Sequence, residues 1–169
     1  TFLSSLEVLN SDNNNILELT PSFNKTILDY TIKVDYSVNN IIINATAEEG
    51  KLMGNGTYTL NSCKNHFEIV VTSVSGDIET YNIDVFKDRN NNSNLLNIEV
   101  EGYNLDKSFD KDIKEYTVTI PKDVTSLKVN VTPESDKATY TIRGNNNLNN
   151  NTNTIVITSI AEDKSYQVY

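Results

Sequence analysis

The chain of 169 residues has no tryptophan, three prolines, one histidine and one cysteine. Because Cys63 is alone, no disulfide can form within the chain, and packing and strand pairing must hold the fold. No apolar stretch approaches the roughly 18 residues of a membrane-spanning helix. Basic residues are outnumbered as well, with 14 Lys and Arg against 23 Asp and Glu, for a net charge of -9. This balance argues against nucleic acid as a partner, because binding to phosphates needs clustered Lys and Arg. The absence of a long apolar stretch argues against membrane insertion.

One stretch of sequence occurs twice. Residues 23–34 read FNKTILDYTIKV and residues 109–120 read FDKDIKEYTVTI, with five of twelve positions identical at an offset of 86. Two copies of one domain in tandem explain this repeat better than one large domain does. We therefore expect a first domain at 1–88, a short polar linker at 89–94 and a second domain at 95–169.

Both copies are predicted to consist of strands. Segments rich in Val, Ile, Thr and Tyr alternate with polar residues, and Asn, Gly, Asp or Ser turns separate them. About seven short strands in each copy indicate two tandem immunoglobulin-like antiparallel β-sandwiches. The expected strands are 3–9, 28–34, 40–47, 51–53, 57–60, 66–73 and 79–86 in the first copy, and 95–101, 113–120, 126–132, 138–142, 154–160 and 165–169 in the second.

The inward positions of the two copies can be overlaid. The first strands match at an offset of 92, and the later strands at 86, which puts six extra residues in the loop after the first strand of copy one. Copy two stops at Tyr169, before equivalents of Val85 and Phe86, so we expect a domain boundary that was trimmed or a final strand that is clipped. In the closing strands we expect Ile69, Val71 and Val74 to match Ile155, Ile157 and Ile160.

These stretches resemble the cadherin-like β-sandwich domain of bacterial secreted and surface proteins. The resemblance is carried by LSSLEV at 3–8, LTPSFNKTILDYTIKV at 19–34, IIINATA at 41–47 and FEIVVTSVSGDIETYNIDV at 67–85. LLNIEV, LDKSFDKDIKEYTVTI, LKVNVTP and NTIVITSIAEDKSYQV repeat the pattern in copy two. The resemblance implies an extracellular spacer or adhesive module, secreted or attached to the cell surface, and it supplies no catalytic residues.

Cys63 and His66, the single cysteine and the single histidine, lie three residues apart and are candidates for a nucleophile and its base. Such a dyad also needs an oxyanion site and an orienting third group. The pair occurs in only one of the two copies, and we therefore predict that the chain is not an enzyme.

Two further sites are candidates. Cadherins place calcium between domains at an Asp-x-Asn-Asp-Asn linker, and this linker contains Asp88, Asn90 and Asn92. The motif's third acid is absent, although calcium prefers several carboxylates, so we expect no cofactor but keep calcium as a hypothesis. For carbohydrate, which stacks on exposed aromatic rings, Tyr103 in a loop is the best candidate.

The sequence thus favours a non-catalytic structural or adhesive tandem module of a secreted or cell-surface bacterial protein. The alternative is a carbohydrate-binding accessory module of a larger extracellular enzyme. The expected partners are a cell-wall or host glycan or an extracellular protein, together with neighbouring domains of a longer chain.

Overall fold

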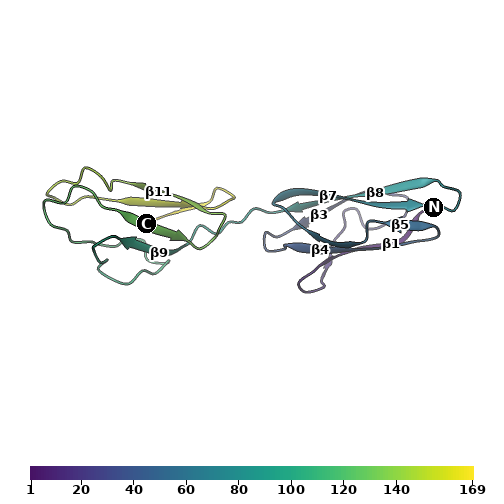
Figure 1. Ribbon diagram of the computed structural model, residues 1–169. Coiled ribbons are helices and arrows are strands. Elements are labelled where there is room, and N and C mark those ends of the chain that lie inside the picture. Colours follow the sequence, from purple (N-terminus) through teal and green to yellow (C-terminus); the bar gives the residue numbers. More distant parts are fainter. The chain divides into compact units, whose positions relative to one another are not determined.

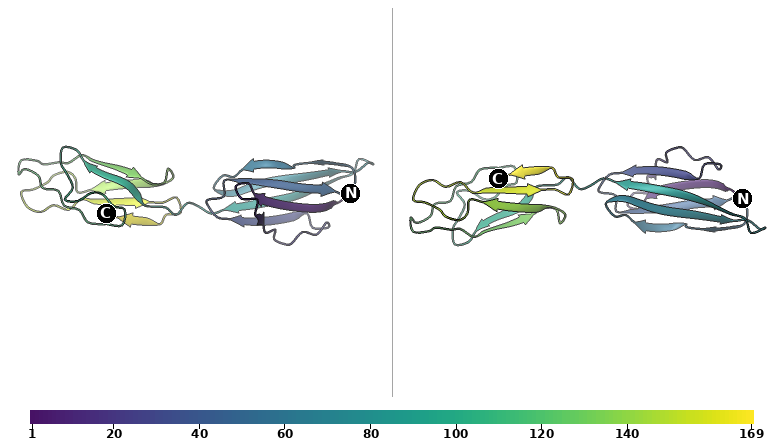
Figure 2. Two further views of the ribbon diagram at one scale, coloured as in Figure 1. Left: turned by 90° about the horizontal axis from the view of Figure 1, so that it is seen from below. Right: turned by 90° about the horizontal axis from the view of Figure 1, so that it is seen from above.

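The computed structural model describes residues 1–169, which form strands and connecting loops without any helix. The chain divides into two compact units, Thr1–Arg89 and Asn90–Tyr169. Within each unit the strands lie in two facing layers, as the views in Figures 1 and 2 show. The prediction of an all-β chain with two immunoglobulin-like sandwiches is confirmed.

The first unit contains two four-stranded sheets. One has the order β2-β1-β4-β6 and is antiparallel throughout, and the other has the order β3-β8-β7-β5. In the second sheet β3 pairs with β8 in parallel, whereas the other pairs are antiparallel. The strands are β1 (Leu3–Asn10), β2 (Ile16–Leu17), β3 (Asp29–Val34), β4 (Asn40–Ala47), β5 (Lys51–Met53), β6 (Gly56–Thr59), β7 (Cys63–Thr72) and β8 (Ile78–Lys87).

The core of the first unit follows from the alternation of its strands. In β3, Tyr30, Ile32 and Val34 are buried, whereas Thr31 and Lys33 are exposed, as the sequence predicts. Aliphatic residues of both sheets meet in the same way and form one continuous cluster. Its buried members are Leu3, Leu6, Val8, Tyr30, Ile32, Val34, Val38, Ile41, Ile43, Ala45, Leu60, Ile69, Val71, Tyr81, Ile83 and Val85.

In each unit the repeated stretch forms a turn that one tyrosine hydroxyl holds through two hydrogen bonds. The Tyr30 hydroxyl donates to the Asn24 carbonyl at 2.7 Å and accepts from the Asn24 N–H at 3.1 Å, and the Phe23 ring packs on the Tyr30 ring. In the second unit the Tyr116 hydroxyl makes the same two bonds with Asp110, each 2.8 Å long. The Phe and the Tyr that are identical in both copies therefore have a structural role, since the Phe109 ring also stacks on the Tyr116 ring.

The second unit has fewer strands than the first. One two-stranded sheet pairs β9 with β10, and a three-stranded sheet has the order β11-β12-β13, all antiparallel. Its strands are β9 (Leu95–Val100), β10 (Val129–Pro133), β11 (Thr139–Arg143), β12 (Val156–Ile160) and β13 (Tyr166–Val168).

Matching hydrogen bonds show which residues of the two units are equivalent. The Tyr81 hydroxyl accepts from the Leu3 N–H at 3.1 Å, and the Tyr169 hydroxyl accepts from the Leu95 N–H at 3.4 Å. Tyr169 thus has the place of Tyr81, at an offset of 88. The predicted offset of 92 for the first strands agrees with this match, since Leu95 is the counterpart of Leu3.

The expected overlay of the closing strands is wrong by two residues. At an offset of 88, Ile69 corresponds to Ile157, and the buried Val71 corresponds to Ser159, which is also fully buried. Val74 is no core residue, since it lies in the turn between β7 and β8 with 87% of its surface exposed. The expected overlay had aligned two identical pairs, Thr72-Ser73 and Thr158-Ser159, which lie before the last turn of each copy but are not structurally equivalent.

The predicted strand 113–120 is also wrong, because these residues form no strand in the second unit. Their counterpart, β3, is held by six parallel pairs with residues 82–87 of β8. The alternating pattern is present, but no strand of the second unit pairs with residues 113–120.

Candidate functional site

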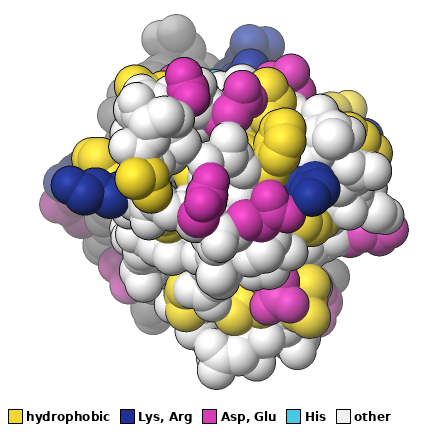
Figure 3. Space-filling model, turned by 90° about the vertical axis from the view of Figure 1, so that its right-hand side faces the viewer, with side chains coloured by type: hydrophobic (Ala, Val, Ile, Leu, Met, Phe, Trp, Pro, Cys, Tyr) yellow, Lys and Arg dark blue, Asp and Glu magenta, His cyan; other side chains and the backbone are white.

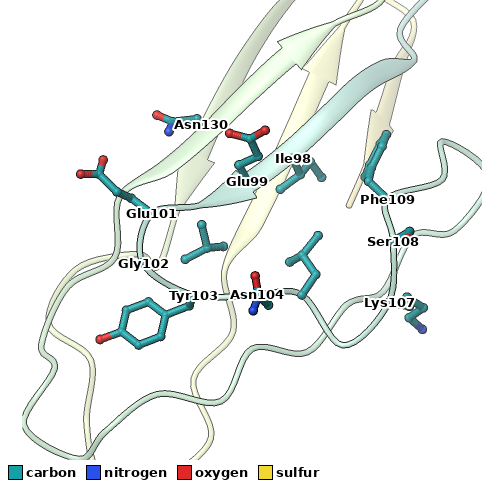
Figure 4. A pocket seen from close by; sticks show the side chains of 12 residues that line it. Ile98, Glu99, Glu101, Gly102, Tyr103, Asn104, Lys107, Ser108, Phe109 and Asn130 are labelled. Carbon is teal, nitrogen blue, oxygen red and sulfur yellow. The ribbon is translucent and has the colours of Figure 1, made fainter.

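A hollow of about 690 Å³ lies beside β9 in the second unit. In Figure 4, Tyr103 lies at one end of it and Phe109 at the other, with Asn104 between them. This size is within the range of small-molecule sites, about 300–1,000 Å³. The lining residues are Ile98, Glu99, Val100, Glu101, Gly102, Tyr103, Asn104, Leu105, Lys107, Ser108, Phe109 and Asn130.

A tight turn at the end of β9 positions Tyr103. The Tyr103 N–H donates to the Val100 carbonyl at 3.1 Å, which closes a four-residue turn. Gly102, the third residue of this turn, has φ +81°, a backbone conformation that favours glycine. The turn reverses the chain, so that the segment after it runs beside β9 and forms the other wall of the hollow.

Tyr103 takes the place that Leu17 has in the first unit. Leu17 pairs with Val8 across β1 and β2, and Tyr103 forms an isolated bridge with Val100, the counterpart of Val8. The Tyr103 ring is half-buried and packs against an apolar cluster that includes Val100 and Leu127. One side of the Tyr103 ring therefore covers the core, and the other side lines the hollow.

The charges at the hollow are mixed, with more acids than bases. Glu101 is paired with Lys128 at 2.6 Å, and Glu99 accepts a hydrogen bond from the Asn97 side chain at 2.7 Å. Lys107 is the only basic residue in the lining. This environment suits a neutral or cationic polar ligand better than an anionic one.

The sequence identified only Tyr103 of this site. The sequence signal for the remainder is the shorter loop in copy two, because it leaves a single bridge at Tyr103 where β2 (Ile16–Leu17) pairs with β1 in the first unit. Polar side chains of Asn104 and Asn130 then reach the hollow. The local sequence around Asn130 does not identify it as a site residue, because only the pairing of β10 with β9 brings it to the hollow.

Cys63 and His66 lie on the same strand but do not contact each other as a dyad. The exposed Cys63 sulfur accepts a hydrogen bond from the Arg89 Nε at 3.4 Å. His66 Nδ1 is 2.8 Å from Asp84 Oδ1, and Nε2 is 3.5 Å from Glu68 Oε1. The hydrogen bond to Asp84, rather than any contact with the thiol, raises the pKa of His66.

The candidate calcium residues are divided between the two units, with Asp88 in the first and Asn90 and Asn92 in the second. The Asn90 side-chain oxygen accepts from the Asn92 N–H at 2.7 Å, and the Asn92 oxygen accepts from the Asn94 N–H at 2.9 Å. No group of three or more His, Cys, Asp or Glu side chains is arranged to hold a metal. Calcium binding by these residues stays a prediction.

Residues 90–94 are held by the second unit. The Asn90 N–H donates to Glu162, and the side chains of Asn92 and Asn94 both donate to Glu134, at 3.0 and 2.9 Å. These bonds hold the carboxylate in its charged form, and the pKa of Glu134 is lowered, chiefly by Asn94. The segment expected as a linker is thus hydrogen-bonded over most of its length.

A family model describes both units. The cadherin-like beta sandwich domain matches residues 3–87 and again 95–169, which together are most of the chain. The chain belongs to the cadherin-like beta sandwich family. The predicted membership is confirmed, in two tandem copies, and domains of this family are generally non-catalytic modules.

No curated protein and no solved structure matches this cadherin-like chain. Its structure has no helix that is long and apolar enough to cross a membrane.

Proposed function

We propose that the two cadherin-like domains form a non-catalytic structural or adhesive segment of a secreted or cell-surface bacterial protein. Such a segment must hold its fold when its two ends are pulled apart. The acidic surface supports this role, because like charges keep neighbouring molecules apart. In Figure 3, acidic side chains are scattered over the visible face, and apolar side chains form separate patches.

The main support for the proposal is the direction in which a pulling force would act on the terminal strands of the first unit. The chain enters through β1, which pairs antiparallel with β4, and leaves through β8, which lies between β3 and β7. Figure 1 shows that the N-terminus and the end of β8 lie at opposite ends of this unit. A pull on the two ends therefore acts along both terminal strands, and many hydrogen bonds must break together.

Single-molecule pulling in two directions tests the strut role. Force applied through Thr1 and Arg89 shears β1 and β8, whereas force applied through Ser62 and Asp88 peels β8 from β7 pair by pair, since Cys63 pairs with Lys87. We expect a several-fold higher rupture force in the first direction. Equal rupture forces would contradict the mechanical role. Localisation outside the cell is part of the same proposal, and surface labelling of the source cells tests it.

The hollow at Tyr103 favours a second candidate, a carbohydrate-binding accessory module. One half-buried aromatic ring beside amide and carboxylate side chains suits a neutral sugar, since the ring can stack on the sugar and the polar groups can accept and donate hydrogen bonds. Calorimetric titration with neutral and acidic polysaccharides tests this. Saturable binding of a neutral polysaccharide that Tyr103→Ala abolishes and Tyr140→Ala retains would support it, because Tyr140 is an exposed tyrosine of the same unit outside the hollow.

A further inference from the structure

One edge of the smaller sheet in the second unit has no neighbouring strand. β10 pairs with β9 on one side, and these two strands form a sheet by themselves. The Glu101 N–H donates to the Lys128 carbonyl at 2.9 Å, so the even-numbered residues of β10 direct their backbone groups to β9. The N–H and C=O groups of Val129 and Val131 therefore point away from β9, and they form no hydrogen bond.

The corresponding edge of the first unit is covered. The counterparts of the two valines are Ile43 and Ala45, since β4 pairs with β1 in the register in which β10 pairs with β9. Ile43 pairs with β6. The Asn55 side chain binds both backbone groups of Ala45, because it accepts from the N–H at 2.7 Å and donates to the C=O at 2.9 Å.

The edge is open in the second unit because the chain crosses between the sheets at a later residue. β5 is three residues long, and the chain then crosses to β6, whereas its counterpart β11 is five residues long. After this later crossing the Leu127 N–H donates to the Asn145 carbonyl at 2.8 Å, and the Asn145 side chain donates to the Leu127 carbonyl at 3.0 Å. These bonds cover the position two residues before Val129 and leave both valines uncovered.

Tyr140 shows the same opening from the opposite sheet. β11 is the strand of that sheet in contact with β10. Tyr140 pairs with the fully buried Ser159, so its side chain leaves the inner face of β11, yet 42% of its surface is exposed. Its counterpart Leu52 is packed against the core of the first unit. An inward side chain that is left this exposed indicates room for a further strand beside β10.

We propose that the open edge of β10 pairs with the same edge of a second copy of this chain, as two antiparallel strands. Val129 of each copy pairs with Val131 of the other, and each valine pair exchanges two hydrogen bonds. Asn130, which lies beside Glu99 of β9 in Figure 4, then faces its own equivalent on the two-fold axis. Lys128 of each copy faces Thr132 of the other.

The ends of the free segment select this partner and this register. Pro133 has no N–H to donate, and Leu127 is already bonded to Asn145, so only the two valines between them are available. An identical strand offers the same two residues in reverse order, and every free group finds a partner. No like charges face each other, since Lys128 lies opposite Thr132. Pairing uses up the edge, so the association stops at a dimer.

The charge of the second unit also favours pairing through this unit. Residues 90–169 carry 11 acids and 8 bases, whereas residues 1–89 carry 12 acids and 6 bases. Repulsion between two copies is therefore weaker at the second unit. A contact of two short strands is weak between free molecules, but a high local density of chains at a cell surface raises their effective concentration. For that setting the contact rests on the proposed function, whereas the pulling test of the first unit can fail independently.

Disulfide trapping of the full chain tests the proposal. In a Cys63→Ser background, Asn130→Cys places two thiols in a non-hydrogen-bonded pair, whose Cα atoms are about 4.5 Å apart and can be bridged by a disulfide. Asn44→Cys is the matched control, because Asn44 is the exposed counterpart in β4, on an edge that β6 and Asn55 cover. We expect covalent dimers to form at least about tenfold faster from Asn130→Cys, because pairing raises the effective concentration of its thiols.

Mixing two further variants in the same background tests the register. A Lys128→Cys chain and a Thr132→Cys chain should cross-link with each other much faster than either does with itself. Equal rates for Asn130→Cys and Asn44→Cys, or self-linking as fast as mixed linking, would overturn the proposal. So would a free peptide of residues 127–133 that protects the Val131 amide from exchange while the Asn130→Cys chain stays monomeric, since this result would assign the edge to a foreign strand.

Discussion

Replacing Tyr81 by phenylalanine removes a single oxygen atom, yet it should destabilise the first unit strongly. The Tyr81 hydroxyl donates to the Lys25 carbonyl at 2.6 Å and accepts from the Leu3 N–H at 3.1 Å. Leu3 is completely buried, so its N–H would be left without water or another partner, at a cost of about 1–3 kcal/mol. The Lys25 carbonyl is nearer solvent, and losing its bond should cost about 0.5–1 kcal/mol.

The expected total is therefore about 1.5–4 kcal/mol, or a fall in Tm of at least about 6 °C for a domain of this size. Urea unfolding of the full chain, followed by NMR signals assigned to each unit, measures the free energy of the first unit separately. Tyr36→Phe is the control, because that half-buried tyrosine makes no hydrogen bond through its hydroxyl. A Tyr81→Phe chain within about 0.5 kcal/mol of the unchanged protein would refute the reasoning, since one ordinary hydrogen bond contributes more than that.

Three further predictions follow from single side chains. Ser159→Val should stabilise the second unit by about 1–3 kcal/mol in chemical denaturation, because the buried Ser159 hydroxyl has no hydrogen-bond partner; a loss of stability would contradict this. Gly54→Ala should destabilise the first unit more than Gly76→Ala, since both have positive φ but an added Cβ at Gly54 would lie 2.3 Å from a backbone oxygen, whereas Gly76 has free space. The pKa of His66 in an NMR titration should lie above 6.5 and fall in Asp84→Asn. Stability from protonated His66 is then fully present below its unfolded pKa and is lost as the pH rises through the higher folded value; a titration that Asp84→Asn leaves unchanged would contradict the assigned cause.

The strands of the first unit could be predicted well from the sequence, because each segment with alternating apolar and polar residues also has a neighbouring strand to pair with. Strands such as β4 at Asn40–Ala47 were predicted with the observed bounds, since apolar and polar residues alternate there and turn residues flank them. Only the two-residue β2 was missed, because pairing with β1 rather than local pattern creates it. Local pattern was sufficient wherever the pairing partner was also present.

The second unit shows where local pattern fails. Residues 113–120 alternate as clearly as β3 does, yet a strand needs a hydrogen-bonding neighbour, and the pattern does not report one. The overlay of the closing strands failed because copy two has two extra residues in the loop between β10 and β11, which moves the offset from 86 to 88 before those strands begin. Residue similarity within the strands does not report an insertion in an earlier loop. For the candidate site, Tyr103 could be predicted from its loop position, but the hollow beside it depends on the shorter loop and on the pairing of β10 with β9.

The central claim is that the two cadherin-like units have separate cores, so that the first unit folds by itself and can serve as an independent element of a strut. Expressing residues 1–89 alone and following their thermal unfolding by circular dichroism and calorimetry tests this directly. The account predicts one cooperative transition, with the calorimetric and van't Hoff enthalpies in agreement. A gradual melt without a transition, or folding only when residues 90–169 are present, would contradict it.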